Sequence, residues 1–393
     1  MKEIHSNINI IGGGLIGSLT AYSLSKLGLT INILEKKPAY DEKKLIDYRT
    51  TAISEGTKNF LDKVGIWNKL KPFSQPIKKI KVIDRKLSDQ LEFDNKRRES
   101  NLGYIIKNKH LLGIAYLLLK ECKNVKIFNN IIIDSFSFNK EKIITSTKSK
   151  KFTSDLNISA DGKNSYVRKI FKTPYFNKNY YKSAFVITFN HSLNHNDTAF
   201  ELFYRHGPLA ILPMKKDKGK FCSSIVWTHN NEYLKNLMAM SNKNIMSVLN
   251  SETQECVGKI TKIISKQFFP LSAHINSKFY EERTIYVGDS AHSFHPIAGQ
   301  GWNLGINDTQ NLYKIINKYM SLGIDIGDSF FCKEYQKDNY YKAYRLYQVT
   351  DKLDSVFKIQ NPIIKLTRTA GINIINKNNK IKNLISDFAM GIN

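Results

Sequence analysis

The stretch INIIGGGLIGSLTAYSLSKLGLTINILE, residues 8–35, decides the fold because it holds a complete strand–turn–helix–strand pattern. An apolar run at 8–11 is followed by a glycine cluster at 12–17 and by a helical pattern that extends to Leu27. A second apolar run at 30–34 ends at Glu35. This order of elements predicts a βαβ unit in a Rossmann-like sheet.

The glycines and the acid of this stretch have separate expected tasks. Gly12 allows the tight turn after the strand, Gly14 permits close approach of a pyrophosphate, and Gly17 lets the helix pack on the strand. Glu35 follows the glycines by about 20 residues, the spacing of an acid that binds ribose hydroxyls. An acid favours a free 2′-hydroxyl, so we expect FAD or NAD rather than NADP.

A second unusual stretch, YVGDSAHSFHPIAGQGWNLG, occupies residues 286–305. It predicts a strand to Val287, a turn, a loop and a helix entered near Trp302. Asp289 stands where the strand ends, so its carboxylate can accept hydrogen bonds from a sugar-like hydroxyl. Gly299-Gln300-Gly301 brings bare backbone to a helix N-terminus, which favours an anion or an electron-rich oxygen.

The chain resembles the class A FAD-dependent aromatic monooxygenases, and within them the ubiquinone-biosynthesis hydroxylases, over nearly its full length. Besides the two stretches above, the resemblance is carried by DYRTTAISEGTKNFLDKVGIW (47–67), LGYIIKN (102–108), SADGKNSYVRK (159–169), GPLAILPM (207–214), FPLSAH (269–274) and TDKLDSVF (350–357). The Gly-Asp, Asp-Gly and Gly-Gln-Gly-x-Asn-Leu motifs are specific to the flavin class, and only the whole set indicates the quinone branch. Two positions depart from the family: Ser290 replaces the usual alanine, and Trp302 a smaller apolar residue.

The resemblance implies an α/β protein of two domains, with a Rossmann-like FAD-binding domain and an antiparallel-sheet substrate domain over the flavin. We expect residues 1–75, 101–175 and 275–335 in the first domain, 76–100 and 176–274 in the second, and a helical C-terminal region at 336–393. Strand-like runs between 185 and 228 favour such a sheet. The aromatic or apolar candidates for lining its cavity, each of which could equally be core, are Phe200, Phe203, Leu212 and Trp227.

In the class that this chain resembles, NADH or NADPH reduces bound FAD, dioxygen adds at flavin C4a, and the hydroperoxide oxygen attacks an electron-rich phenol. The protein supplies position and electrostatics. The resemblance implies that Asp289 holds the ribityl chain and that the residues around the ring are Pro296, Gly299, Gln300, Gly301, Trp302, Asn303 and Leu304. Among them we expect Pro296 and Gln300 beside the reacting centre. His292 is either a proton relay or a structural hydrogen-bonding residue.

Two further positions are assigned by resemblance, each with an open alternative. Arg49 is expected at the FAD pyrophosphate, since arginine suits phosphate oxygens, or it is a surface arginine. Asp161 is expected to organise the pyrophosphate region and to contact the nicotinamide nucleotide, or it forms an Asx turn beside glycine.

Composition narrows the class of protein. The formal charge of +26 and the pI of about 9.6 suit an anionic membrane surface, but lysines are dispersed as genome bias would produce. No nucleic-acid-binding module accompanies the charge, so no nucleic acid is expected as partner. The four cysteines are scattered, which predicts free thiols in a cytoplasmic protein and no metal site. No secretory signal and no bilayer-spanning run is expected, and peripheral contact with the inner membrane stays open.

The expected partners are a prenylated phenol and O2, with a ubiquinone-biosynthesis complex and a homo-oligomer as further options. Two rivals remain. The same fold could epoxidise or hydroxylate another substrate, such as a soluble hydroxybenzoate held by Arg205. The chain could also be a non-catalytic flavoprotein scaffold of a lipid-biosynthesis complex.

Overall fold

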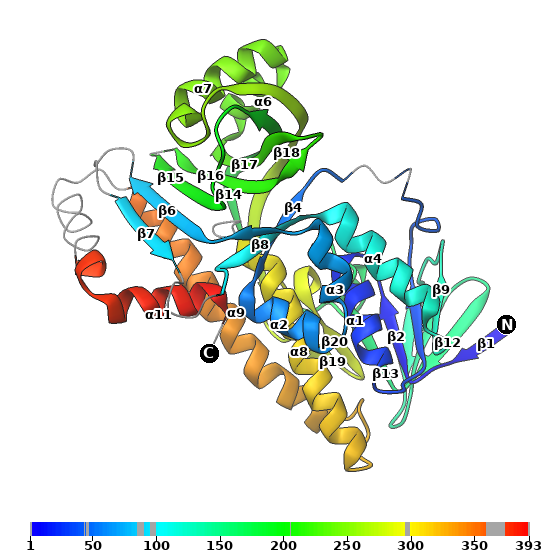
Figure 1. Ribbon diagram of the computed structural model, residues 1–393. Coiled ribbons are helices and arrows are strands. Elements are labelled where there is room, and N and C mark those ends of the chain that lie inside the picture. The colour runs from blue at the N-terminus through cyan, green and yellow to red at the C-terminus, as the bar shows by residue number, and fades with distance from the viewer. Residues whose placement is uncertain are drawn as a thin grey trace.

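The computed structural model describes residues 2–42, 44, 47–84, 90–94, 100–204, 206–294, 299–358 and 374–391. Two large sheets dominate the architecture (Figure 1). The first has six strands in the order β19 (Tyr280–Glu281), β20 (Thr284–Tyr286), β13 (Leu156–Ser159), β2 (Ile8–Ile11), β3 (Ile31–Leu34) and β9 (Val125–Phe128). From β20 to β9 all neighbours are parallel, which confirms the Rossmann-like sheet.

Helices cover one side of this sheet. α1 (Leu15–Ser25) packs between α4 (Asn108–Glu121) and α8 (Gln300–Ser321), and α9 (Ser329–Lys358) packs on α8. A smaller sheet of β1 (Lys2–His5), β12 (Lys150–Ser154), β11 (Ile143–Ser146) and β10 (Ser135–Phe138) packs on β2 and β9, with Phe152 against Phe128. The strands β2, β3, β13 and β20 are buried along their whole length, as in a parallel sheet that is covered on both faces.

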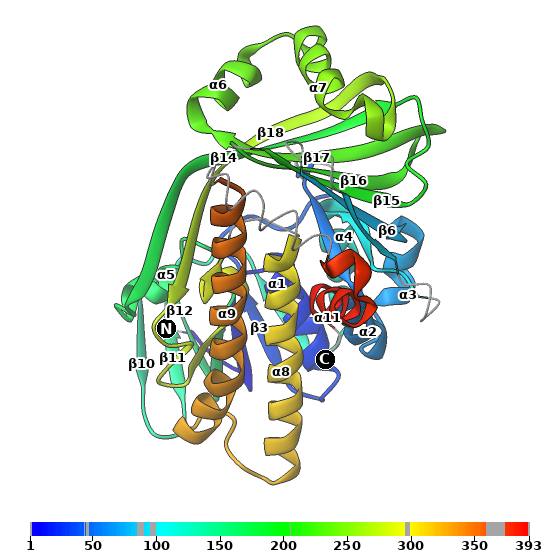
Figure 2. The same cartoon turned by 90° about the vertical axis from the view of Figure 1, so that its left-hand side faces the viewer.

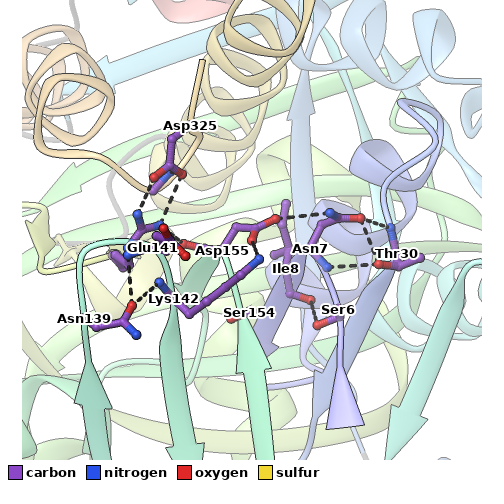
Figure 3. A network of polar contacts seen from close by, with 12 residues as sticks. Ser6, Asn7, Ile8, Thr30, Asn139, Glu141, Lys142, Ser154, Asp155 and Asp325 are labelled. Atoms are coloured by element: carbon purple, nitrogen blue, oxygen red, sulfur yellow. Dashed lines mark hydrogen bonds and ion pairs between the residues drawn. The ribbon is translucent and has the colours of Figure 1, made fainter. Parts of the chain in front are cut away.

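Polar contacts join the small sheet to the parallel sheet (Figure 3). Asp155 accepts hydrogen bonds from Asn7 at 3.1 Å and from Lys142 at 2.5 Å. The Asn7 side chain also accepts from the Thr30 backbone at 2.9 Å, directly before β3. The network therefore holds β1, β2, β3 and β12 in register at the edge opposite the site.

The second large sheet, which we name the roof, has eight strands (Figure 2). Their order is β21 (His292–Ser293), β18 (Ile260–Asn276), β14 (Tyr175–His191), β17 (Lys220–Asn230), β16 (Gly207–Asp217), β15 (Thr198–Tyr204), β6 (Lys79–Asp84) and β7 (Gln90–Asp94). The neighbours are antiparallel except for β15 with β6. The predicted antiparallel sheet is thus confirmed.

The outer face of the roof is covered by α6 (Asn231–Ala239) and α7 (Asn242–Val257). Trp227 and Phe200 belong to the core between the roof and these helices, so of the two alternatives the core role holds for them. Alternation along the strands places Leu212 on the opposite face, which we call the underside, where it packs with other apolar residues. α6 and α7 are separate helices, because Ser241 caps the second one.

The remaining elements connect the two sheets and the C-terminal part of the chain. They are β4 (Thr50–Ser54), α2 (Glu55–Lys63), α3 (Trp67–Leu70), η1 (Lys71–Phe73), β5 (Gln75–Ile77), β8 (Gly103–Lys107), α5 (Tyr166–Ile170), η3 (Gly288–Ser290) and α11 (Asn379–Met390). α11 ends against α2: a Cβ on Gly56 would lie 2.2 Å from the Gly391 carbonyl oxygen, and Met390 is buried under the roof. Leu384 on the same helix is 70% exposed. Among the described helices, none has an apolar stretch long enough to cross a bilayer.

Candidate cofactor and substrate site

The glycine turn after β2 has the geometry that the sequence predicts. Gly12 adopts a φ of +104°, and a Cβ there would lie 2.5 Å from the Ala160 carbonyl oxygen. A Cβ on Gly17 would lie 1.9 Å from the Gly12 carbonyl oxygen, so this residue sets the approach of α1 to the turn. A Cβ on Gly14 would meet no atom within 4 Å. Gly14 therefore faces open space, as a backbone that admits a pyrophosphate must.

Glu35 binds this turn through its carboxylate. Its Oε2 accepts from the Gly13 amide at 2.5 Å, and its Oε1 accepts from the Lys37 amide at 2.8 Å. The Tyr116 hydroxyl donates to the Gly13 carbonyl oxygen at 3.0 Å, and its ring stacks on Tyr40 at 4.6 Å. Burial raises the pKa of Tyr116 to about 12, so it remains a hydrogen-bond donor. Sequence reasoning missed both tyrosines, because they lie far from the glycines in the chain.

Asp289 follows β20 in η3 and is exposed to solvent, yet protein surrounds its carboxyl group closely enough for desolvation to raise its pKa. The nearby positive charges of His292, Lys163 and Arg49 oppose that shift. An acid that is accessible and desolvated at once lies in a recess of the protein. Three basic groups beside one acid make this recess suitable for a ligand that carries both phosphate and hydroxyl groups.

Arg49 precedes β4 and lies near Asp289, as its effect on that carboxyl group indicates. Asp47 accepts two hydrogen bonds from its guanidinium, at 2.9 and 2.7 Å, and the guanidinium carbon lies 5.5 Å from the centre of the Phe269 ring. About half of the Arg49 side chain is exposed. The structure therefore brings the predicted arginine to the site and fixes its orientation through Asp47.

Asp161 caps α5. Its Oδ2 accepts from the backbone amides of Tyr166 and Val167, at 2.6 and 3.1 Å, and its Oδ1 accepts from the Ser159 hydroxyl. The Asp161 Cα also lies 3.0 Å from the position of a Cβ on Gly12. The residue thus organises the wall beside the glycine turn, which is one of the two tasks expected of it. Arg168 lies close by, buried, and donates to the Ser290 carbonyl oxygen at 3.1 Å.

His292 is buried and pairs with α8. Its Nε2–H donates to Asp308 Oδ2 at 2.7 Å, and the same oxygen accepts from the Gly288 amide at 2.9 Å. The His292 ring stacks on Phe294 at 5.3 Å. Its Nδ1 is buried without a hydrogen-bond partner among the described residues. The geometry supports the structural role directly and leaves one ring nitrogen for a relay.

α8 begins at Gln300, two residues before the expected start, because Gly299 adopts the left-handed conformation with φ +62°. Asn303 ties this helix start to β4: its Oδ1 accepts from the Ser54 amide at 2.9 Å, and its Nδ2 donates to the Ala52 carbonyl oxygen at 2.8 Å. Asn303 therefore positions the helix N-terminus with its side chain rather than presenting that side chain to a ligand.

The other predicted residues of this helix start differ in their surroundings. A Cβ on Gly301 would meet no atom within 4 Å, so open space borders this backbone. Trp302 and Leu304 are half-buried and pack against the main core, and the Trp302 Nε1 has no partner among the described residues. Gln300 is half-buried at the first helical position. Pro296 lies outside the described residues.

These features fit FAD. Two stretches of bare backbone, at Gly14 and Gly301, border open space, and the accessible carboxyl group of Asp289 is accompanied by Arg49 and Lys163. Burial lowers the pKa of Lys163, and the Asp289 carboxylate opposes this effect. Bare backbone at a helix N-terminus accepts a ring system or a phosphate that a side chain would exclude. A parallel sheet with a glycine-rich turn and such a recess defines a dinucleotide-binding oxidoreductase.

Comparison with known proteins identifies the dinucleotide. The FAD binding domain family matches residues 5–321, and the chain belongs to this family. It is 26% identical over 391 residues to the ubiquinone hydroxylase UbiL of Rhodospirillum rubrum, covering 98% of this chain and 90% of that protein. It is 27% identical to the mitochondrial ubiquinone biosynthesis monooxygenase COQ6 of Drosophila melanogaster, covering 98% and 90%. This chain is an FAD-dependent monooxygenase, as its resemblance implied.

The solved structure of p-nitrophenol 4-monooxygenase PnpA from Pseudomonas putida DLL-E4 has the same fold. It superposes with a TM-score of 0.79 at 16% identity and covers 100% of this chain and 99% of that one. PqsL from Pseudomonas aeruginosa, described as a probable FAD-dependent monooxygenase, superposes with a TM-score of 0.76, covering 94% and 99%. Both likenesses concern the arrangement of the two large sheets.

Proposed function

We propose that this protein hydroxylates the aromatic ring of a prenylated phenol in ubiquinone biosynthesis, with NADH or NADPH as reductant and O2 as oxidant. The main support is the full-length similarity to UbiL, which is named a ubiquinone hydroxylase, and to COQ6, which is named a ubiquinone biosynthesis monooxygenase. When bound, FAD accepts a hydride from the nicotinamide and activates dioxygen for insertion into the ring. The chain itself binds the cofactor, orients the substrate and excludes water.

The underside of the roof supports a substrate that carries no acid group. Its central positions on β16 and β17 are Ala210, Leu212, Ser224 and Val226, which present no positive charge. A soluble hydroxybenzoate needs a basic partner for its carboxylate. Arg205, the residue considered for that role, lies outside the described residues. Central positions without a positive charge instead suit a phenol with an isoprenoid chain.

We assign the cofactor contacts by the open space at each position. In this proposal the Gly12–Gly17 turn binds the pyrophosphate with Arg49, Glu35 accepts from the ribose, and Asp289 accepts from the ribityl hydroxyls. The α8 N-terminus from Gly299 to Leu304 lies along the flavin ring, where its amides stabilise negative charge on the reduced ring. Gln300 lies beside the reacting centre, His292 supports the loop, and Asp161 borders the nicotinamide.

The division into domains that we propose keeps the expected bounds. We assign residues 1–75, 101–175 and 275–335 to the FAD-binding domain, 76–100 and 176–274 to the substrate domain, and 336–393 to the helical C-terminal region. We also propose peripheral contact with an anionic membrane, supported by the +26 charge and by Leu384 on α11. We further propose that the protein associates into a homo-oligomer or a biosynthetic complex.

The test is turnover by purified, flavin-loaded protein. NADH or NADPH oxidation is measured with a prenylphenol, together with hydroxylated product and released peroxide. The proposal requires product in step with reductant consumed. Oxidation of NADH or NADPH that yields only peroxide, with no hydroxylated product, indicates a scaffold or another substrate. Flavin that neither NADH nor NADPH reduces has the same meaning. Mass spectrometry of the quinone precursors that accumulate in a deletion strain then identifies the ring position.

A further inference from the structure

One row of residues crosses the underside of the roof from β6 to β18. The strand register pairs Glu201 of β15 with Val82 on one side and with Ala210 on the other. The row continues through Val226 and Val186 to Gln267. Every one of these residues is partly accessible to solvent. On the outer face beside them, Leu202, Leu209 and Ile225 are fully buried.

Glu201 is the only charged residue in this row. The described residues give it no hydrogen bond or ion pair, and its neighbours along β15 on the same face are Ala199 and Phe203. The nearest acid on that face is Asp84, two residues along β6 from Val82. An acid without a partner on an apolar face is costly to retain, unless a ligand binds it.

The surroundings of Glu201 resemble those of Asp289 in one respect. Its side chain is partly accessible, yet desolvation alone raises its pKa to about 7. Both acids therefore border a space that water enters and protein encloses. The roof extends above the N-terminal end of α8 and the C-terminal end of α9, and α9 approaches β15 and β16 (Figure 2). β15, the strand that carries Glu201, therefore lies close to α9, the helix that packs on α8.

We propose that Glu201 binds the hydroxyl group of the phenol and accepts its proton during ring hydroxylation. This inference rests on the proposed function and adds a residue that orients and activates the substrate. The phenolic O–H bond breaks, a carboxyl O–H bond forms, and the electron pair left on oxygen enriches the ring. Glu201 holds the proton until the product leaves.

The chemistry of the carboxyl group suits this task. A phenol has a pKa near 10, whereas an ordinary glutamate lies near 4.3, so proton transfer between them is strongly uphill. At about 7 the pKa of Glu201 is closer to the phenol, which makes it a more effective base at neutral pH. A carboxylate on this face also repels an aromatic acid. The same residue therefore favours phenols over hydroxybenzoates.

The test compares Glu201→Gln, Glu201→Asp and the control Glu232→Gln, an exposed acid on α6 above the roof. Flavin-loaded proteins are titrated with 2-prenylphenol and with 4-hydroxy-3-prenylbenzoate, and turnover is followed from pH 5.5 to 9. We expect wild-type turnover to rise with pH through about 7, where Glu201 becomes ionised. In Glu201→Gln this limb should disappear and kcat should fall by roughly 10²-fold or more.

The three variants also separate activation from folding. Glu201→Gln should keep its flavin and its melting temperature, bind the phenol about tenfold more weakly, and lose its preference over the benzoate. Glu201→Asp should recover part of the rate and keep the pH limb, and Glu232→Gln should match wild type. Wild-type turnover with an unchanged Glu201→Gln variant overturns this inference alone. Wild-type protein that hydroxylates no phenol overturns the proposed function itself.

Discussion

Asp308 on α8 joins two segments of the loop after β20 through one carboxylate oxygen, which lies 2.7 Å from His292 Nε2 and 2.9 Å from the Gly288 amide. Both side chains of the pair are almost wholly buried. This contact connects the segment that holds Asp289 to α8, the helix that begins at Gln300. The Asp289 segment and the start of α8, the two parts of the proposed flavin site, are therefore held by the same Asp308 side chain.

Asp308→Asn should weaken these contacts. The amide oxygen can still accept from both donors, but it carries no negative charge. The amide NH2 group takes the place of Oδ1, which is buried without a hydrogen-bond partner among the described residues. A buried donor without a partner costs roughly 1–3 kcal/mol. We expect unfolding by urea at lower concentration and faster loss of flavin on gel filtration. The exposed Asp62→Asn serves as the control. An Asp308→Asn protein with wild-type stability and flavin retention would contradict this role.

An added methyl group should affect FAD affinity at one glycine of this turn and the stability of the apoprotein at another. Gly14→Ala places its Cβ in open space, so the apoprotein should keep its stability while FAD affinity falls. Gly17→Ala forces a Cβ toward the Gly12 carbonyl oxygen, so the apoprotein itself should be destabilised, by roughly 1–3 kcal/mol or more. Chemical denaturation of the apoproteins and FAD titration separate the two effects. Equal stability losses would argue that Gly14 is a packing residue. Gly14→Val should abolish flavin retention altogether.

Asp289→Ala should yield a folded but colourless protein, because the acid contributes to binding rather than to the core. Asp62→Ala should stay yellow. Desolvation raises the pKa of Asp289. On acidification its carboxylate therefore becomes protonated at a higher pH than that of an ordinary aspartate, whose pKa is about 3.9. FAD affinity should therefore decline as the pH falls through that range, and Asp289→Asn should remove this dependence. Full flavin occupancy in Asp289→Ala would falsify the assignment.

Gly56→Ala tests the packing of the C-terminal end of α11 against α2. Helix propensity alone predicts a gain of up to about 1 kcal/mol from this change in α2. The added Cβ would instead lie 2.2 Å from the Gly391 carbonyl oxygen, so the C-terminal turn must move and expose Met390. We expect faster proteolysis within 374–391 and lower stability. Asn59→Ala, on the exposed side of α2, should show neither effect.

The βαβ unit could be predicted closely because its signals are local. The apolar run at 8–11 and the glycines bound β2 on both sides, and the structure places this strand at Ile8–Ile11. The start of α8 was expected two residues late, since helix signals do not reveal that Gly299 takes a left-handed conformation. Boundaries that depend on one backbone torsion are not readable from residue types alone.

The faces of the roof could not be assigned from the sequence, because alternation gives two faces without telling which one α6 and α7 cover. Cavity lining and core therefore stayed open for Trp227 and Phe200, which the structure places in the core. Glu201 was missed for the same reason, although an acid within the otherwise apolar run AFELFY was the available signal. Arg49 and Asp161 reached the site as expected. Their partners Asp47 and Tyr166 depend on side-chain directions that only the folded chain supplies.

The parallel pairing of β13 with β20 has a consequence for biogenesis. A nascent chain that has completed β13 leaves one edge of the parallel sheet unpaired until all the strands from β14 to β18 have emerged from the ribosome. Asp289 appears later still. Flavin capture is thus a late event in the life of each molecule, and a newly made chain passes through a cofactor-free stage with an open sheet edge.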